Sequence, residues 1–137
     1  AQVFDSGDQF ERRTADLVPA LFNASNDNGD IDDRSPAKGP AKGPEPEGVT
    51  TGRIGDKTYA FIGLERVGGV MVYDVSKPAA PVFVTYLNPR AADGSGDSGP
   101  EGLHFVRAAH SPNGKPLLIV GNETSGTTAV FQLNLGY

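Results

Sequence analysis

The sequence predicts an all-β fold, and three observations support that prediction. Glycine and proline are frequent, with 18 and 11 copies in 137 residues, and long helix-forming runs are rare. This balance favours short strands joined by turns. Several short runs after residue 47 alternate apolar with polar residues, as strands do. Finally, a whole block of these runs occurs twice along the chain.

The N-terminal region, residues 1–22, predicts a strand and a short helix. An apolar pair near the N-terminus breaks at Ser6, as a strand entering a turn would. Thr14 is the expected helix N-cap, with Asp16 in the first turn. Pro19 then limits the helix to about one or two turns.

A long loop is expected at residues 23–46, where hydrophobic residues almost vanish. A compact domain usually keeps such a loop only when it is functional or mobile. Its acidic part invites comparison with an EF-hand, but Ala24 and Ser35 stand where the first Asp and the bidentate Glu belong. An irregular calcium loop and a solvated acidic turn both remain open. The carboxylates concerned are Asp27, Asp30, Asp32 and Asp33.

Two repeated units follow this loop, at residues 47–90 and 91–137. The segment "PEGVTTGRI…KTYAFIGLERVGGVMVYDV" of the first unit aligns with "PEGLHFVRA…KPLLIVGNETSGTTAVFQL" of the second. The first unit contains four β-rich runs in meander order, whereas the second stops after three. A period of about 50 residues with four short strands is typical of a β-propeller blade.

We therefore expect a β-propeller-like fold with about two four-stranded antiparallel blades, the second incomplete. A strand from a preceding blade and long acidic, Gly- and Pro-rich loops complete this single unit, residues 1–137. Propellers usually have about four to eight blades, so two cannot close a ring. The expected partners are the rest of a longer propeller chain or identical copies. The run "TTAVFQLNL" also leaves an open strand edge that another chain could extend.

Composition excludes several partners and sites. The chain has 12 basic and 17 acidic residues, a formal charge of -5, and its basic residues are scattered. A nucleic-acid partner is therefore not expected. No apolar run reaches the length of about 20 residues that a membrane helix needs, and no secretory leader is apparent at Ala1. Cysteine is absent, which excludes disulfides and thiolate metal sites but leaves oxygen-ligated cations open.

Repeated glutamates are the main candidate site. Glu47 maps to Glu101 at the start of a first strand, and Glu65 maps to Glu123 at the end of a second strand. In a propeller, these positions converge near the axis. Clustered carboxylates repel one another unless a proton or cation neutralises them, so convergence predicts structural Ca²⁺. Alternatively, each Glu accepts hydrogen bonds from turn amides and closes its blade.

Acidic, glycine-rich loops supply further candidate metal ligands. They lie in "DSGD" near the N-terminus and in "DGSGDSG" before the second unit, and for both a solvated acidic turn is the competing interpretation. The candidate ligands are Asp5, Asp8 and Asp97.

Signals for catalysis are sparse. His104 and His110 are the only histidines, and His104 alternates with apolar neighbours in a predicted strand. Ser125 and Thr127 are possible nucleophiles, but the sequence indicates no positioned base for them. A turn between strands accounts for Ser125-Gly126. We therefore assign no catalytic or cofactor-binding residue.

Several long motifs resemble a known family. In order along the chain, they are "VFDSGDQFE", "KGPEPEGV", "YAFIGLERVGGVMVYDV", "GPEGLHFV" and "SPNGKPLLIVGNETSGTTAVF". Together they are similar to the C-terminal part of the choice-of-anchor I domain, a bacterial extracellular family related to mesenchyme-specific cell surface glycoproteins. The resemblance implies a β-propeller-like protein that is exported or surface-attached, sometimes joined to phosphatase or nucleotidase modules. The tandem "AKGP" copy and the shorter length depart from the family pattern.

These observations lead to one expected function and two alternatives. We expect an extracellular, cell-surface or periplasmic propeller protein that acts as a binding or assembly module with structural calcium. A metal-dependent phosphoesterase of the alkaline phosphatase or phytase propeller type is the first alternative. Self-assembly into a ring or filament through open strand edges is the second.

Overall fold

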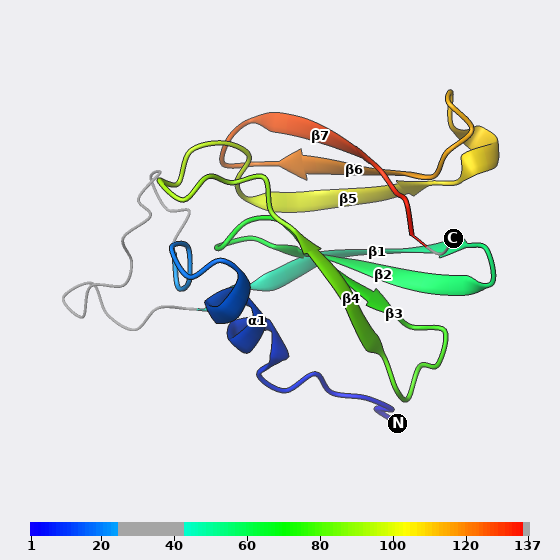
Figure 1. The fold of residues 1–137 in the computed structure, drawn as a ribbon, viewed down its shortest axis with the longest axis horizontal. Coiled ribbons are helices and arrows are strands. Elements are labelled where there is room, and N and C mark those ends of the chain that lie inside the picture. The colour runs from blue at the N-terminus through cyan, green and yellow to red at the C-terminus, as the bar shows by residue number, and fades with distance from the viewer. Residues whose placement is uncertain (25–42, 136–137) are drawn as a thin grey trace.

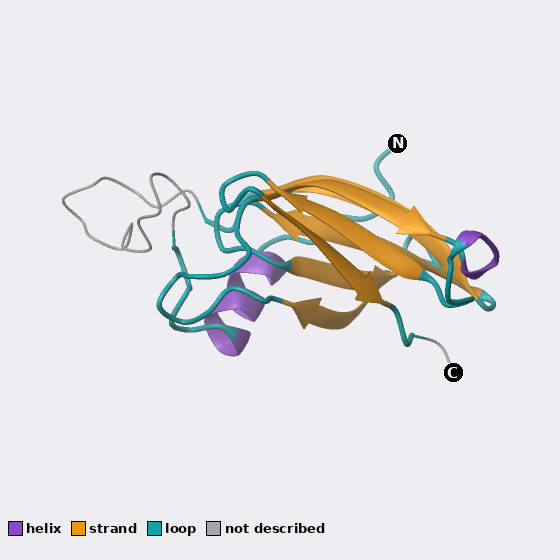
Figure 2. Cartoon of the chain, turned by 90° about the horizontal axis from the view of Figure 1, so that it is seen from above, coloured by secondary structure: helices purple, strands orange, loops and turns teal. Residues whose placement is uncertain are grey.

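Two antiparallel sheets lie face to face in the structure, and one helix covers the outer face of the larger sheet (Figures 1 and 2). The computed structural model describes residues 1–24 and 43–135. Sheet A has the strand order β1-β2-β3-β4, and sheet B has the order β5-β6-β7. The elements are α1 (Gln9–Leu17), β1 (Pro46–Ile54), β2 (Lys57–Leu64), β3 (Val70–Asp74), β4 (Val82–Leu87), β5 (Pro100–Val106), a 3₁₀ turn (Ala108–His110), β6 (Leu117–Asn122) and β7 (Thr127–Gln132).

The predicted strand content and connectivity are confirmed. Each sheet follows sequence order, with every strand antiparallel to its neighbour. Neither sheet closes on itself, so the structure shows two stacked open sheets. Among the described residues, no helix is long and apolar enough to cross a membrane.

The predicted N-terminal elements are wrong in two respects. Residues 2–4 form no strand, and the helix begins at Gln9 instead of after Thr14. Thr14 is a buried residue within α1, where its hydroxyl donates to the Phe10 carbonyl at 2.9 Å. The 3.6-residue period explains this placement, because Phe10 and Thr14 lie one turn apart on the face that packs against sheet A.

The main core lies between the two sheets. Phe61, Val72 and their neighbours on β2 and β3 pack against Leu118 and Val120 of β6. Phe61 also stacks on Phe105 of β5, with ring centroids 5.9 Å apart. Burying a side chain of this size stabilises the fold by about 1.5–3 kcal/mol, so this layer holds sheet B on sheet A.

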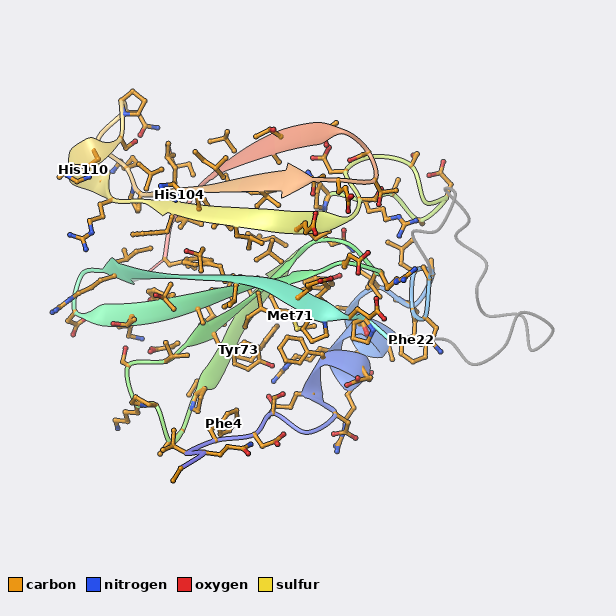
Figure 3. All side chains as sticks on the ribbon, turned by 180° about the vertical axis from the view of Figure 1, so that it is seen from behind. Phe4, Phe22, Met71, Tyr73, His104 and His110 are labelled. Atoms are coloured by element: carbon orange, nitrogen blue, oxygen red, sulfur yellow. The ribbon has the colours of Figure 1, made fainter. Side chains whose placement is uncertain are left out.

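A second core lies on the opposite face of sheet A, beneath α1. Phe10 of the helix packs with Met71 and Tyr73, and the Phe10 and Tyr73 ring centroids are 5.7 Å apart. Tyr73 and Met71 point to this side of sheet A in Figure 3, where Phe4 of the N-terminal segment also lies. The helix therefore covers part of the face that sheet B leaves free.

Glycines allow β1 and β5 to approach closely. A Cβ atom at Gly52 would overlap the ring of Phe105, and one at Gly48 would lie 2.7 Å from Leu103 Cδ1 and overlap the Glu101 carbonyl. Because residue numbers rise together on both strands at these contacts, β1 and β5 run in the same direction, side by side (Figure 1). The two units are therefore stacked in the same orientation.

The backbone register supports the internal repeat. Pro46 pairs with Leu64 in sheet A, and Pro100 pairs with Asn122 in sheet B. Each first strand then has a register shift within its first residues. The same turn closes both units, since the Glu65 amide donates to the carbonyl of residue 45 at 3.0 Å and the Glu123 amide donates to Gly99 at 2.7 Å. Positions 47 and 101, and 65 and 123, are thus structurally equivalent.

Replacing Gly52 with alanine should destabilise the chain by about 1–3 kcal/mol, because the new methyl group would clash with the Phe105 ring. Gly102→Ala is the matched control, since no heavy atom lies within 4 Å of a Cβ added there. This control should change the free energy of unfolding by no more than about 0.5 kcal/mol. Urea denaturation measures both. Equal effects of the two substitutions would contradict the close approach of β1 to β5.

Candidate functional site

Three predicted glutamates gather where the two sheets begin. Glu47 is the second residue of β1, and Glu101 is the second residue of β5. Glu65 follows the last residue of β2, which pairs with the first residue of β1. Because β1 and β5 lie side by side in the same direction, the carboxylates of both units share one end of the structure. We call Glu47, Glu65 and Glu101 the carboxylate cluster.

The carboxylate cluster perturbs the titration of Glu47. A side-chain hydrogen bond with Glu65 is the largest cause and raises the Glu47 pKa above its ordinary value. The charge of Glu65, some desolvation, and the charges of Glu101 and Glu45 raise the pKa further. Two carboxyl groups can share a hydrogen bond only when one holds a proton, so this pair favours a proton or another cation between them.

Glu45 differs from the cluster residues because it has a cationic partner. Its Oε2 atom lies 2.7 Å from Nε of Arg66, and the two side chains are only 29% and 11% exposed. Glu45 adopts a positive φ of 47°, and the equivalent position in the second unit is Gly99, with φ of 72°. The left-handed conformation is unusual for a glutamate. Its carboxylate is therefore engaged by Arg66 at the turn that enters β1.

Glu123 lies on the neighbouring side of Glu101. Both line a shallow surface hollow of about 330 Å³. Asn122 and Thr127 line the same hollow, and the Asn122 amide donates to the Thr127 hydroxyl at 3.3 Å. Glu101 thus belongs to the carboxylate cluster and also lines this polar hollow.

Asp97 fixes the loop that leads into β5. Its Oδ1 atom accepts a hydrogen bond from the Thr127 hydroxyl at 2.7 Å. The Ser98 amide donates to Ser125 Oγ at 3.0 Å, which joins the same loop to the β6–β7 turn. Residues 123–126 form the predicted turn between strands. These contacts give Asp97 a structural role, and its role as a metal ligand remains a prediction.

Asp5 and Asp8 make local contacts before α1. Asp5 accepts hydrogen bonds from the Gly7 amide at 2.8 Å and the Gln2 side chain at 2.9 Å, and both lower its pKa. Asp8 occupies the helix N-cap position and pairs with Arg12 at 2.7 Å, which lowers the Asp8 pKa. Both carboxylates thus have partners within the protein, and their role as metal ligands remains a prediction.

Within residues 1–24 and 43–135, no group of three or more carboxylate or imidazole side chains is arranged to hold a metal ion. The irregular calcium loop predicted from Asp27 to Asp33 lies outside the described residues. The two histidines lie on sheet B and its 3₁₀ turn and are labelled in Figure 3.

Two features of the site were not predicted from the sequence. The first is the ion pair between Glu45 and Arg66, and the second is the polar network of Asp97, Ser125 and Thr127. The sequence offered one signal for the ion pair: the first unit has Glu45 where the second unit has Gly99. No sequence spacing indicated the polar network, because its members lie 27 and 30 residues apart.

Comparison with known proteins finds one family. Residues 1–78 match the family model of the choice-of-anchor I domain. Gigasin-3a from Magallana gigas is 27% identical over 147 aligned positions, which cover 96% of this chain and 51% of Gigasin-3a. The chain therefore spans about half the length of this curated relative. No solved structure matches the chain.

Replacing Glu47 with glutamine should stabilise the chain at neutral pH and have little effect in acid. A raised pKa in the folded state means that the stability contributed by Glu47 is present below its unfolded pKa, near 4.3, and is lost as pH rises through the folded value. The advantage of the variant should therefore grow with rising pH. Thermal unfolding from pH 4 to pH 8 measures this difference.

Asp56→Asn removes the same charge from the turn at the far end of β1 and is the control. Its unfolding temperature relative to wild type should not follow the pH trend of Glu47→Gln. A parallel pH response in both variants would show that overall charge, and not the cluster, causes the effect.

Proposed function

The chain belongs to the choice-of-anchor I domain family, and from this membership we propose that it works as a β-propeller-like, surface-associated module. Its expected location is extracellular, on the cell surface or in the periplasm. Its expected role is binding or assembly. Family membership supports the surface association, and the stacked repeats support the propeller architecture.

The observation that carries this proposal is the stacking of two equivalent sheets. Adjacent propeller blades are successive antiparallel sheets packed face to face, with their first strands side by side near the axis. Sheets A and B meet both conditions through β1 and β5. Since propellers usually have about four to eight blades, further sheets must complete a ring. A longer chain or identical copies could supply them.

We further propose that Ca²⁺ binds at the carboxylate cluster. The cluster offers the carboxylate oxygens that a hard cation prefers. In the described structure these side chains are not arranged to hold a metal ion, so binding would require them to move closer together. The side chain of Glu65 and the charge of Glu101 raise the pKa of Glu47, so positive charge beside these carboxylates is favoured. A bound cation would supply the neutralising charge at neutral pH. Glu47, Glu65 and Glu101 are the residues we expect to hold it.

A phosphoesterase would need more than this cluster provides. Two-metal phosphoesterases place their ions about 3.5–4 Å apart with open coordination positions. The described part of the chain shows one group of neighbouring carboxylates, and its member Glu101 also lines a polar hollow with Glu123. We therefore favour the binding module and treat hydrolysis as an outcome that would contradict it.

Surface association can be tested on intact cells that produce the full-length protein. A membrane-impermeant amine reagent should label the protein before lysis, or after permeabilisation of the outer membrane if the protein is periplasmic. Labelling that requires disruption of the inner membrane would contradict the proposed location. A cytoplasmic marker protein provides the control for cell integrity.

Calcium binding can be tested by thermal unfolding after removal of divalent cations. Added Ca²⁺ should raise the unfolding temperature of the wild type, with a rise that continues with the logarithm of concentration above the dissociation constant. Glu47→Gln and Glu101→Gln should abolish or strongly reduce this rise, whereas Asp56→Asn should keep it.

An unchanged calcium response in Glu47→Gln would place the cation elsewhere. Hydrolysis of a generic phosphomonoester by the full-length protein would contradict the binding-module proposal if the activity were lost in Glu47→Gln and Glu101→Gln.

A further inference from the structure

The two sheets differ at their last edge. In sheet A, β3 pairs with β2 on one side and with β4 on the other. The repeat makes β7 the equivalent of β3, because Val130 pairs with Ile119 as Val72 pairs with Phe61. Among the described residues, however, no strand pairs with the second side of β7. Sheet B thus presents an edge where sheet A carries β4.

The backbone alternation identifies which groups this edge offers. The Leu133 amide donates to the Pro116 carbonyl at 2.9 Å, so odd-numbered residues of β7 direct their amides toward β6. Even-numbered residues therefore direct their amides and carbonyls away from β6. These residues are Thr128, Val130 and Gln132. Their equivalents on β3 are Val70, Val72 and Asp74, which pair with β4 in sheet A.

An exposed valine on β4 provides a second, independent observation. Val82 of β4 pairs with Asp74, which pairs with Tyr59 of the main core. Directly paired residues share a face, so Val82 lies on the face of sheet A that sheet B covers elsewhere. It is nevertheless 62% exposed. β4 contributes no residue to the main core. Sheet B has three strands and sheet A has four, so sheet B does not extend over β4.

Within the described residues, the chain does not turn back after β7 to pair with this edge. Leu133 is buried in the main core, and the partly buried Leu135 packs against the same cluster. In sheet A, by contrast, the chain turns after Asp74 and returns as β4. None of the seven described strands fills this edge, so a strand bound there would come from other polypeptide. Gigasin-3a has about half of its length outside the region matched to this chain, so a relative of this kind has further chain for such a strand.

We propose that the free edge of β7 binds one extended segment as an antiparallel fourth strand of sheet B. The segment has the alternating apolar pattern of β4 and comes from polypeptide outside the seven strands described here, not from an edge strand of a second copy. It would form backbone hydrogen bonds with Thr128, Val130 and Gln132. The inference rests on the repeat architecture of the proposed function, but on neither calcium nor surface location.

A fluorescent peptide with the sequence of residues 80–89, APVFVTYLNP, serves as the probe because it contains the strand that fills the equivalent edge. Its fluorescence anisotropy should rise and saturate as the full chain is added. Val130→Pro should weaken binding at least about tenfold, since it removes an outward amide and adds a ring at the edge. This amide is not bonded to β6, so the fold should persist. Val130→Thr retains the amide and should bind normally.

Peptide variants test the same point without changing the protein. In sheet A, Thr85 and Leu87 pair with the β3 residues whose amides face β4, whereas Tyr86 faces away. N-methylation at the Thr85 position should therefore abolish binding, and N-methylation at Tyr86 should preserve it. Circular dichroism of each protein variant reports whether the sheets remain folded.

Three results would overturn this inference. The first is no binding of the peptide to the folded wild type, and the second is equal binding of both methylated peptides. The third is self-association of the wild type, measured by light scattering, that Val130→Pro abolishes, because a second copy would then occupy the edge. Each can occur while the calcium response and surface labelling are intact, so failure of this inference is distinguishable from failure of the proposed function.

Discussion

The close contact between β1 and β5 is the constraint on which the other features depend. Gly48 and Gly52 have no side chains to separate the strands, so Leu103 and Phe105 of β5 lie directly over the β1 backbone. This contact aligns the rings of Phe61 and Phe105 and closes the core between the sheets. Since interiors are densely packed, a single added methyl group at the contact must displace a ring or a strand.

The same contact explains the electrostatics of the site. Because β1 and β5 start side by side, Glu47 and Glu101 lie at the same end of the two sheets. Glu65 joins them from the turn after β2. Like charges held together by the fold raise the cost of ionisation, and the pKa of Glu47 rises accordingly. Arg66 offsets the charge of Glu45 at the neighbouring turn. The cluster is therefore a consequence of how the repeats stack, which links the core to the proposed cation site.

The unequal width of the sheets is the other consequence of the repeat. Sheet A covers its outer face with α1 and completes its edge with β4, whereas sheet B ends at β7. Both sheets are open, and an open edge with unpaired backbone groups is a template for another strand. A structure made of equivalent stacked sheets can thus be extended by face-to-face stacking of further sheets and by edge pairing. Both ways of extension suit the proposed role in assembly.

The sequence alone predicted the seven strands after residue 45, their order and the repeat, because alternation and glycine turns are local signals. It wrongly predicted a further strand near the N-terminus. It also predicted that Glu47, Glu65, Glu101 and Glu123 converge. The structure brings the first three together, whereas Glu123 lines a surface hollow beside Glu101. It misplaced the helix start, because Thr14 looks like a cap until its burial against sheet A is known. Only the tertiary structure decided that Arg66 pairs with Glu45 and that Asp97 bonds to Thr127. Those partners lie 21 and 30 residues apart and meet through sheet packing, which no local pattern records.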